Sequence, residues 1–309
     1  MKAGIIGAGA LGSLFAHKFQ RAGISYSILE KDSAVVDEIN NNGLTLIDSD
    51  TSDIIHPLIS TNPAIISDAD IILFFVKSYS TSDAVESIRS YIRDDSIIVS
   101  LQNGLGNFES IAEYFDKDRI VLGTTTTGAT KTGPASVRAG GEGVITIGSS
   151  SADSLETADI LFSKACQKFN RIFNPHIAVW KKAVLNSGIN PIASIMNISN
   201  GEILENPYCM KLQEQVVMEA VNTANSAGIS LSYNSMLSEV RDVCIKTSTN
   251  ICSMLQDIKS KRKTEIDSIN GAIIKTASDH NLNVPVTETL YNIVKGIELK
   301  NVTMFNSNN

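Results

Sequence analysis

Two short segments of the chain carry residue types whose spacing could do chemistry. The first segment matches the pattern G-x-G-x-x-G through Gly7, Ala8, Gly9, Ala10, Leu11 and Gly12. Between a strand and a helix, such glycines allow a tight turn, a close backbone approach to a pyrophosphate, and close packing of the helix on the strand. The N-terminus of the helix adds N–H donors and a partial positive charge. The segment therefore predicts a dinucleotide-binding turn.

The second segment is a polar stripe in the other half of the chain. Lys182, Asn186 and Asn190 are spaced four apart, so they lie on one face of a helix. A cation and two amides that point the same way can bind a carboxylate, a carbonyl or several hydroxyls. A solvated polar face is the ordinary alternative, but Val184 and Ile189 beside the stripe place it at the edge of a core. The stripe is therefore a candidate substrate site.

Polar residues also follow two of the strands that the sequence predicts. Lys77 follows the apolar run 71–76, and Asn103 follows the run 97–100 within Gln102-Asn103-Gly104. Open parallel sheets bind ligands at the carboxyl ends of their strands. A solvated lysine and an Asn-Gly turn would explain the same residues without any ligand. Both positions are therefore candidates, and both alternatives stay open.

The elements that must position these residues differ between the two halves of the chain. The first half alternates short β-branched runs with segments of helical period, which predicts an α/β fold with a doubly wound, mostly parallel sheet of the Rossmann type. Glycines at 133, 140, 141 and 143 punctuate short alternating stretches such as 144–147, which predict hairpin strands added to that sheet. We expect strands at 3–6, 26–29, 71–76, 97–100 and 120–125, and helices that begin near Leu11, Ser33, Ser80, Asn107 and Ser154.

The second half has helical period throughout and predicts an all-helical domain. Asn174-Pro175 marks the boundary, because proline bars regular structure on its N-terminal side. The sequence thus predicts a dinucleotide-binding domain at 1–174 and a helical domain at 175–309. Within the latter, Asn250 and Ser253 are expected on one helix face, and Glu265 in the first turn of a helix. The predicted helices span 176–199, 208–227, 233–258, 264–279 and 286–299.

Composition excludes several classes of protein. The 309 residues are 43% hydrophobic, and 26 basic against 33 acidic side chains give a net charge of −7. The hydrophobic fraction is too high for a disordered chain, and the net negative charge does not favour nucleic-acid binding. The four cysteines lack metal-ligand spacing, so we expect no metal site. No apolar run approaches a membrane span or the core of a signal peptide, and we expect a cytoplasmic protein with no membrane partner.

With these motifs assembled, the chain resembles the ketopantoate reductase (2-dehydropantoate 2-reductase) family along nearly its whole length. The resemblance is carried by the glycine motif at 7–12 and by Val76-Lys77, and most specifically by the block 253–258 with 264–267 and 269–271. Further matching segments are Leu101-Gln102-Asn103-Gly104, Gly123-Thr124-Thr125-Thr126, Trp180-Lys181-Lys182, Asn186, Asn190-Pro191 and Asn200-Gly201. The resemblance implies reduction of 2-dehydropantoate to (R)-pantoate with NADPH, a step toward pantothenate and coenzyme A.

The resemblance also implies roles for single residues. Lys182 matches the general acid, Glu265 an acidic residue near cofactor and substrate, and Asn103 a residue close to the nicotinamide and the substrate. Lys31 stands where the family often has an arginine for the 2′-phosphate. Other cofactor contacts fall on Lys77 and Ala129, and substrate contacts on Asn186, Asn190, Asn200, Asn250 and Ser253.

The sequence leaves three questions open. Glu30, next to Lys31, would bind a free ribose 2′-hydroxyl and repel a 2′-phosphate, so NADH stays beside NADPH as a cofactor. A reductase of another 2-oxo acid or of an imine, and a noncatalytic dinucleotide sensor, are the alternative functions. The amphipathic helices fit a monomer or a homodimer equally well.

Overall fold

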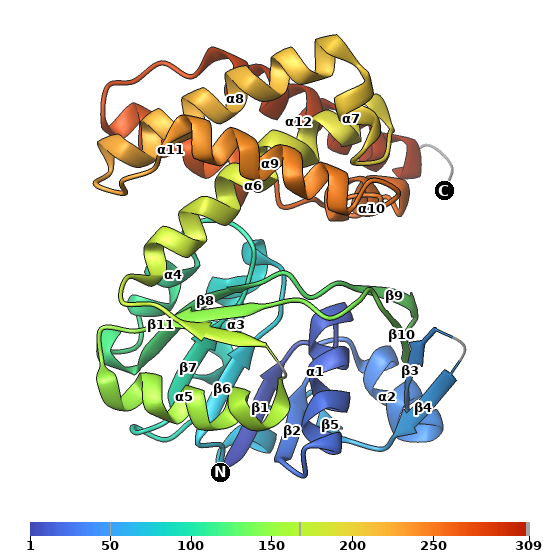
Figure 1. The fold of residues 1–309 in the computed structure, drawn as a ribbon. Helices are drawn as coiled ribbons and strands as arrows, with labels where there is room; N and C mark the ends of the chain where they lie inside the picture. The colour runs from blue at the N-terminus through green and yellow to red at the C-terminus, as the bar shows by residue number, and fades with distance from the viewer. Residues whose placement is uncertain (50, 167, 307–309) are drawn as a thin grey trace. The chain divides into compact units, whose positions relative to one another are not determined.

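A computed structural model describes residues 1–49, 51–166 and 168–306, and Figure 1 labels most of their helices and strands. The chain forms two compact units. The first contains Met1–Gln102 and Asn107–Ala178, and the second contains Asn103–Gly106 together with the chain from Val179 onward. The division falls inside helix α6 (Pro175–Met196), whereas the sequence places the domain boundary at the first residue of that helix.

Among the described residues, the first unit is built on an eight-stranded sheet in the order β12-β11-β8-β7-β6-β1-β2-β5. Its strand pairings are parallel except for that of β11 with β8. This sheet confirms the predicted fold class. Its strands are β1 (Lys2–Ile6), β2 (Ser25–Leu29), β5 (Leu58–Ser60), β6 (Ile71–Phe74), β7 (Ile97–Ser100), β8 (Ile120–Thr125), β11 (Ile145–Gly148) and β12 (Phe169–Arg171).

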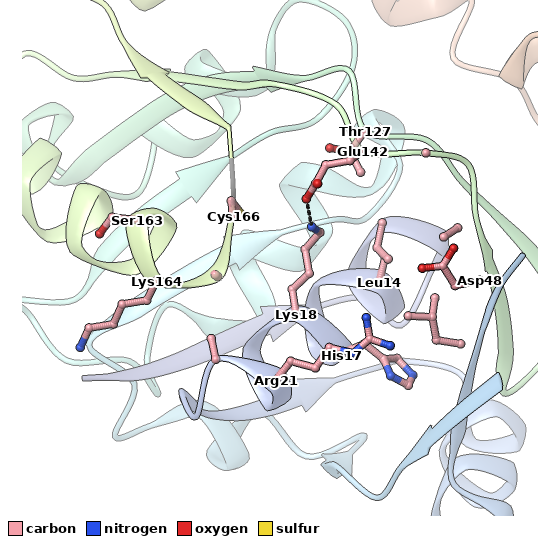
Figure 2. Close-up of a pocket in the computed structure, with 15 residues that line it drawn as sticks. Leu14, His17, Lys18, Arg21, Asp48, Thr127, Glu142, Ser163, Lys164 and Cys166 are labelled. Atoms are coloured by element: carbon pink, nitrogen blue, oxygen red, sulfur yellow. Dashed lines mark hydrogen bonds and ion pairs between the residues drawn. The ribbon is translucent and has the colours of Figure 1, made fainter. Parts of the chain in front are cut away.

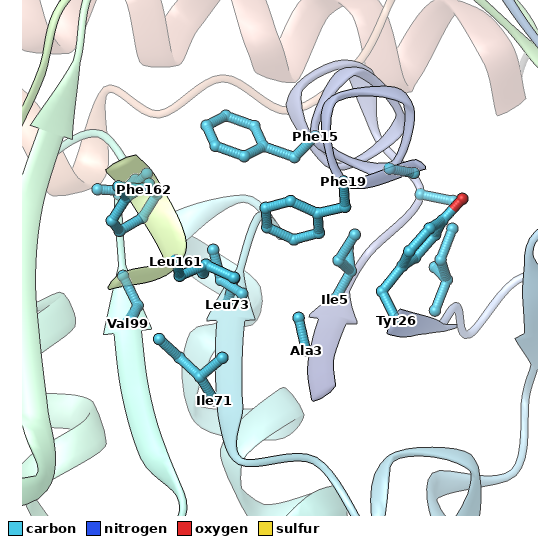
Figure 3. Packing of buried hydrophobic residues seen from close by; sticks show 14 of the residues in the cluster. Ala3, Ile5, Phe15, Phe19, Tyr26, Ile71, Leu73, Val99, Leu161 and Phe162 are labelled. Carbon is cyan, nitrogen blue, oxygen red and sulfur yellow. The ribbon is translucent and has the colours of Figure 1, made fainter. Parts of the chain in front are cut away.

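Helices cover both faces of this sheet because its strands are apolar on both sides. Along β6, Ile71 and Leu73 join one buried cluster, and Ile72 and Phe74 join another. Figure 3 shows the first cluster, where Phe15 and Phe19 of α1 (Ala10–Arg21) and Leu161 and Phe162 of α5 (Ala152–Ala165) meet the strands. The second cluster contains residues of α3 (Thr81–Ile88) and α4 (Asn107–Ala112), while α2 (Ser33–Asn42) contributes to the first.

The predicted strands all form, with ends within two residues of the predicted ones. The run 71–76 becomes a strand only to Phe74, and β6 lies between β7 and β1, as its continuous apolar character predicts. The stretch 144–147 forms β11 and joins the sheet as expected.

A second, four-stranded sheet corrects part of the hairpin prediction. Its order is β4-β3-β10-β9, and its strands are β3 (Leu44–Asp48), β4 (Thr51–Ile55), β9 (Ala129–Gly133) and β10 (Ser136–Ala139). The hairpin β9-β10 therefore does not extend the main sheet. β10 pairs in parallel with β3, which lies far away in the sequence, and no local pattern encodes that pairing.

In the second unit the described elements from Val179 onward are helical, as predicted. The expected helix 233–258 is wrong, however, because the chain leaves helical geometry after Lys246 and resumes at Ser253. The expected helix 264–279 begins only at Asp267, so Glu265 lies in the bend before it and not in its first turn. Side chains in the Thr-Ser-Thr-Asn run 247–250 compete with helical hydrogen bonds. The helices are α7 (Glu202–Glu205), α8 (Pro207–Ser226), α9 (Tyr233–Lys246), α10 (Ser253–Lys259), the π-helical turn η4 (Asp267–Gly271), α11 (Ala272–Asp279) and α12 (Pro285–Asn306).

No helix in the described part of the chain is long and apolar enough to cross a membrane.

Candidate functional site

The glycine motif forms the turn between β1 and α1. Gly7 has φ of +96°, a conformation that side chains disfavour. A Cβ on Gly12 would lie 1.9 Å from the carbonyl oxygen of Gly7, so the helix can pack on the strand only without one. These two glycines are therefore required by the fold itself.

Gly9 has no such structural requirement. Its φ and ψ of −68° and −169° are open to any residue, and a Cβ there would meet only the carbonyl oxygen of Phe75, at 3.8 Å. No other described residue crowds the place of the missing side chain, and a glycine here would let a pyrophosphate approach the backbone closely. No side chain caps α1 at Gly9, so the first turn of the helix is available to an anion. The turn, which also includes Ala8, Ala10 and Leu11, fits a dinucleotide.

Glu30 follows β2 and bonds to this turn. Its Oε2 accepts a hydrogen bond from the backbone N–H of Ala8 at 2.7 Å, and its Oε1 accepts one from the N–H of Asp32 at 3.0 Å. The neighbouring Lys31 is exposed. From the sequence, either Glu30 or Lys31 could contact the ribose of a dinucleotide. The hydrogen bond between Glu30 and the turn is visible only in the structure.

Three further residues of the first unit bear on the predicted cofactor contacts. Lys77 is half-buried and caps the short 3₁₀ turn Ser78–Ser80, three residues beyond the end of β6. Buried Gln102 holds this loop, because its Nε2 donates to the carbonyl of Val76 at 2.9 Å and to Thr81 Oγ1 at 2.8 Å. Ala129 is half-buried at the start of β9. The sequence motif contains Gln102 but does not reveal this supporting contact.

The stripe of Lys182, Asn186 and Asn190 lies on α6 as predicted. Lys182 and Asn186 are half-buried, and Asn190 is buried. Burial lowers the pKa of Lys182 from its ordinary 10.5 to about 8, against the opposing effect of the negative charge on Glu265. A lysine with this pKa can give up its proton near neutral pH, which suits a general acid.

Glu265 and Asn103 meet within the second unit. Asn103 Nδ2 donates to Glu265 Oε2 at 3.3 Å, although the two residues are 162 positions apart. The N–H of Leu105 donates to the carbonyl of Ser268 at 2.8 Å. Gly104 has φ of +87°, and a Cβ on it would lie 2.8 Å from that same carbonyl oxygen. The Asn-Gly pair thus docks on the turn that carries Glu265, and Gly104 is the residue that permits the approach.

Helix α12 fixes the turn around Glu265. Glu298 Oε1 accepts hydrogen bonds from the backbone N–H and the hydroxyl of Thr264, at 2.7 and 2.6 Å. One residue past Ile266, Asp267 accepts a bond from the hydroxyl of Tyr291 at 2.9 Å and pairs with Lys295 at 3.2 Å. Burial opposes ionisation of Asp267, yet these bonds hold its pKa below the usual value. The sequence contains no signal for these contacts.

The remaining predicted substrate residues lie around the break between α9 and α10. Asn250 is exposed in the loop and Ser253 is the first residue of α10, so they do not share a helix face and that expectation is wrong. The backbone N–H of buried Asn200 donates to the carbonyl of Asn250 at 3.0 Å, and Cys252 Sγ donates to the carbonyl of Asn190 at 3.7 Å. These contacts hold Asn200 and the Asn190 end of the stripe against the loop between α9 and α10.

A cavity of about 470 Å³ lies elsewhere in the first unit, lined by residues of α1, β3 and the end of α5 (Figure 2). Two of its basic side chains already have acidic partners: Lys18 pairs with Glu142 at 3.1 Å, and Arg21 pairs with Asp53 at 3.2 Å. Burial lowers the pKa of His17, whose Nε2 bonds to the carbonyl of Leu44. None of the predicted site residues lines this cavity. Among the described residues, no cluster of His, Cys, Asp and Glu could hold a metal ion.

Two family models match the chain and together cover most of it. The model described as ketopantoate reductase PanE/ApbA matches residues 3–152, and the model of its C-terminal part matches residues 177–298. A 2-dehydropantoate 2-reductase of Halobacterium salinarum is 33% identical over 299 residues, which are 96% of this chain and 98% of that protein.

Solved structures show the same fold. A D-mandelate dehydrogenase with NADH and anilino(oxo)acetate matches with a TM-score of 0.92 and 25% identity, over 97% of this chain and 99% of that one. A PanE/ApbA family ketopantoate reductase from Ralstonia eutropha matches with a TM-score of 0.90, again at 25% identity and with the same coverage. The predicted resemblance and fold class are both confirmed.

Proposed function

The chain belongs to the ketopantoate reductase family, an oxidoreductase family that uses a nicotinamide dinucleotide, and we propose that it reduces 2-dehydropantoate to (R)-pantoate. The observation that carries this proposal is the cluster of Lys182, Glu265 and Asn103. It combines a lysine of lowered pKa, a carboxylate whose charge acts on that lysine, and an amide bonded to the carboxylate.

Lys182 is the proposed general acid. A bound, reduced nicotinamide dinucleotide supplies the hydride that reaches the ketone carbon of the substrate. Negative charge then develops on the ketone oxygen, where the ammonium at Nζ stabilises it and donates the proton that completes the hydroxyl. Lys182 is left as a neutral amine and regains a proton from solvent. Its pKa of about 8 makes both directions of this proton transfer accessible near neutral pH.

Glu265 and the amides have supporting parts in this proposal. The Glu265 carboxylate favours the charged form of Lys182, which burial disfavours, so the acid is protonated when the substrate arrives. Asn103 holds that carboxylate through its Nδ2. Asn186 and Asn190 continue the stripe along α6 and would orient the substrate's carboxylate or hydroxyl. Asn200, Asn250 and Ser253 are proposed to complete the substrate contacts.

The cofactor proposal rests on the glycine turn. Two of its glycines serve the fold, while the bare backbone at Gly9 serves an approaching anion. The resemblance implies NADPH, with Lys31, Lys77 and Ala129 as contacts. The position of Glu30 bears on the choice between NADPH and NADH.

A second candidate function has support of its own. The match to a D-mandelate dehydrogenase that binds NADH favours reduction of an aromatic 2-oxo acid on the same scaffold. Such a substrate lacks the hydroxyl of 2-dehydropantoate, and the amides of Asn186 and Asn190 then have one group fewer to bind. The amide-rich stripe therefore favours the hydroxylated substrate.

Oxidation of NADH and of NADPH by the purified protein separates these candidates. 2-Dehydropantoate is compared with phenylglyoxylate, pyruvate, 2-oxoisovalerate and a cyclic imine at matched concentrations. We expect kcat/KM for 2-dehydropantoate to exceed the values for the other substrates by about a hundredfold, because a substrate without the hydroxyl leaves polar groups of the site unpaired. A higher value for phenylglyoxylate would overturn the proposal in favour of the second candidate. Dinucleotide binding without any turnover would favour a sensor.

A further inference from the structure

Glu30 is fixed to the dinucleotide turn at two points. Each of its carboxylate oxygens accepts one backbone hydrogen bond, Oε2 from Ala8 at 2.7 Å and Oε1 from Asp32 at 3.0 Å. The strand that leads to it is also tied to the turn, because the N–H of Gly7 donates to the carbonyl of Leu29 at 2.8 Å. The carboxylate therefore has a set position relative to Gly9, where the pyrophosphate would approach.

In this position an acidic residue can hydrogen-bond the adenosine ribose. An acidic residue about 20 positions after the glycine motif hydrogen-bonds the ribose 2′-hydroxyl in NAD-binding turns of this kind. An ionised carboxylate offers about four lone-pair positions, and the two backbone bonds occupy two of them. Each oxygen of Glu30 thus keeps an acceptor for a ribose hydroxyl.

In the described part of the chain, neither of the lysines around Glu30, Lys31 and Lys131, is bonded to its carboxylate. Lys31 is exposed on a flexible stem. The ammonium of Lys131, on β9, donates to the carbonyl of Pro134, and the charges of Glu30 and Asp32 already act on it. Asp32 adds a second carboxylate, held by the N–H of Ala34 at the start of α2. A 2′-phosphate would bring close to two further negative charges to this place.

We infer that Glu30 makes this chain select NADH over NADPH. The inference rests on the proposed function, since it takes the dinucleotide at the glycine turn to be the reductant. Ribose hydroxyls donate to Glu30 in NADH, whereas in NADPH a phosphate replaces one of those donors and faces a carboxylate that two backbone bonds prevent from moving aside.

Binding of the two dinucleotides without any ketone tests the inference directly. Dissociation constants for NADH and NADPH are measured by isothermal titration calorimetry at one fixed salt concentration. The wild-type protein should bind NADH at least about tenfold more tightly, since like charges brought together across an interface cost enough for that ratio. In Glu30→Gln the ratio should fall below about threefold, mainly because NADPH binds more tightly without the repulsion.

Three further variants complete the test. Lys31→Ala tests the rival role that the resemblance gives to this exposed lysine, and the ratio should stay within about threefold of wild type if Glu30 decides the choice. Asp37→Asn removes an exposed carboxylate on α2 and is the control for loss of a nearby negative charge. Glu30→Ala removes the charge and both backbone contacts, and should lower the ratio as Glu30→Gln does. Thermal melts of all variants identify any that fail to fold, and agreement between the two Glu30 variants guards against a local rearrangement in one.

Several outcomes would overturn the inference. These are tighter binding of NADPH by the wild type, an unchanged ratio in both folded Glu30 variants, a selective loss of NADPH in Lys31→Ala, or failure to bind either dinucleotide. A preference for NADH without turnover of 2-dehydropantoate would refute the proposed function and leave the inference standing. Turnover of 2-dehydropantoate with a preference for NADPH would do the reverse.

Discussion

The glycine turn and the cluster around Lys182 are assembled in opposite ways. At the turn, the backbone provides the contacts: Gly12 packs against the carbonyl of Gly7, and Glu30 is bound by the N–H of Ala8, 22 positions away. At the cluster, Asn103 and Glu265 meet across 162 positions, and Thr264 is held by Glu298 of α12. The turn therefore depends on the absence of side chains at its glycines. The cluster depends on the presence and the charge of its side chains.

This difference predicts where each region is vulnerable. A turn made of backbone tolerates changes in the residues around it but not an added Cβ. A cluster of side chains keeps its fold when one group is removed, but loses the chemistry of that group.

Removal of the proposed acid should have the largest effect. Lys182→Ala should lose at least about a hundredfold in kcat, the usual contribution of general acid catalysis, while its affinity for dinucleotide stays unchanged. Steady-state kinetics and calorimetry on the same preparation measure the two quantities. Lys181→Ala is the matched control, because a turn of about 100° along the helix aims that lysine elsewhere. Near wild-type turnover in Lys182→Ala would remove it from the acid role.

Alanine at two glycines of the turn should give opposite results. Gly12→Ala sets a Cβ against the backbone of Gly7 and should lower the free energy of unfolding by about 3 kcal/mol, the upper range for overpacking. Gly9→Ala meets only the Phe75 carbonyl at 3.8 Å, so stability should hold while dinucleotide affinity falls at least about tenfold. Urea unfolding and calorimetry separate the two effects. A stable Gly9→Ala that binds dinucleotide normally would contradict the placement of the pyrophosphate.

The pH dependence of turnover should report on Lys182. The acid must be protonated to act, so kcat should be level below its pKa of about 8 and decrease as pH rises through that value. Above it, the protonated fraction falls about tenfold per pH unit. Glu265→Gln removes the charge that favours the ammonium and should move this decline to lower pH. A decline that stays in place in Glu265→Gln would mean that Glu265 does not act on Lys182.

The smallest of these effects should come from the support of Glu265. Glu298→Ala leaves the buried N–H and hydroxyl of Thr264 without their partner and should cost about 2 kcal/mol of stability. Urea unfolding measures this loss. Asn292→Ala, an exposed change on the same helix, is the control and should lie within about 0.5 kcal/mol of wild type. Equal stability of the two variants would show that α12 does not hold the turn.

The fold could be predicted from the sequence wherever periodicity and punctuation were strong. The continuous apolar run at 71–76 predicted a central strand covered on both faces, and β6 has that place. The hairpin β9-β10 was predicted in the wrong sheet, because its pairing with β3 depends on a segment far away in the sequence. The break between α9 and α10 was missed, since the apolar period continues through it while the polar run 247–250 interrupts the backbone hydrogen bonds.

The sequence by itself determined the dinucleotide turn, the family, the α/β and helical halves, and the stripe of Lys182, Asn186 and Asn190, because each is written in residues a few positions apart. Only the tertiary structure decided that Glu30 bonds to the turn, that Asn103 meets Glu265, and that burial brings the pKa of Lys182 to about 8. Hydrogen bonds and desolvation act through space, and the packing of distant segments sets the distances on which both depend.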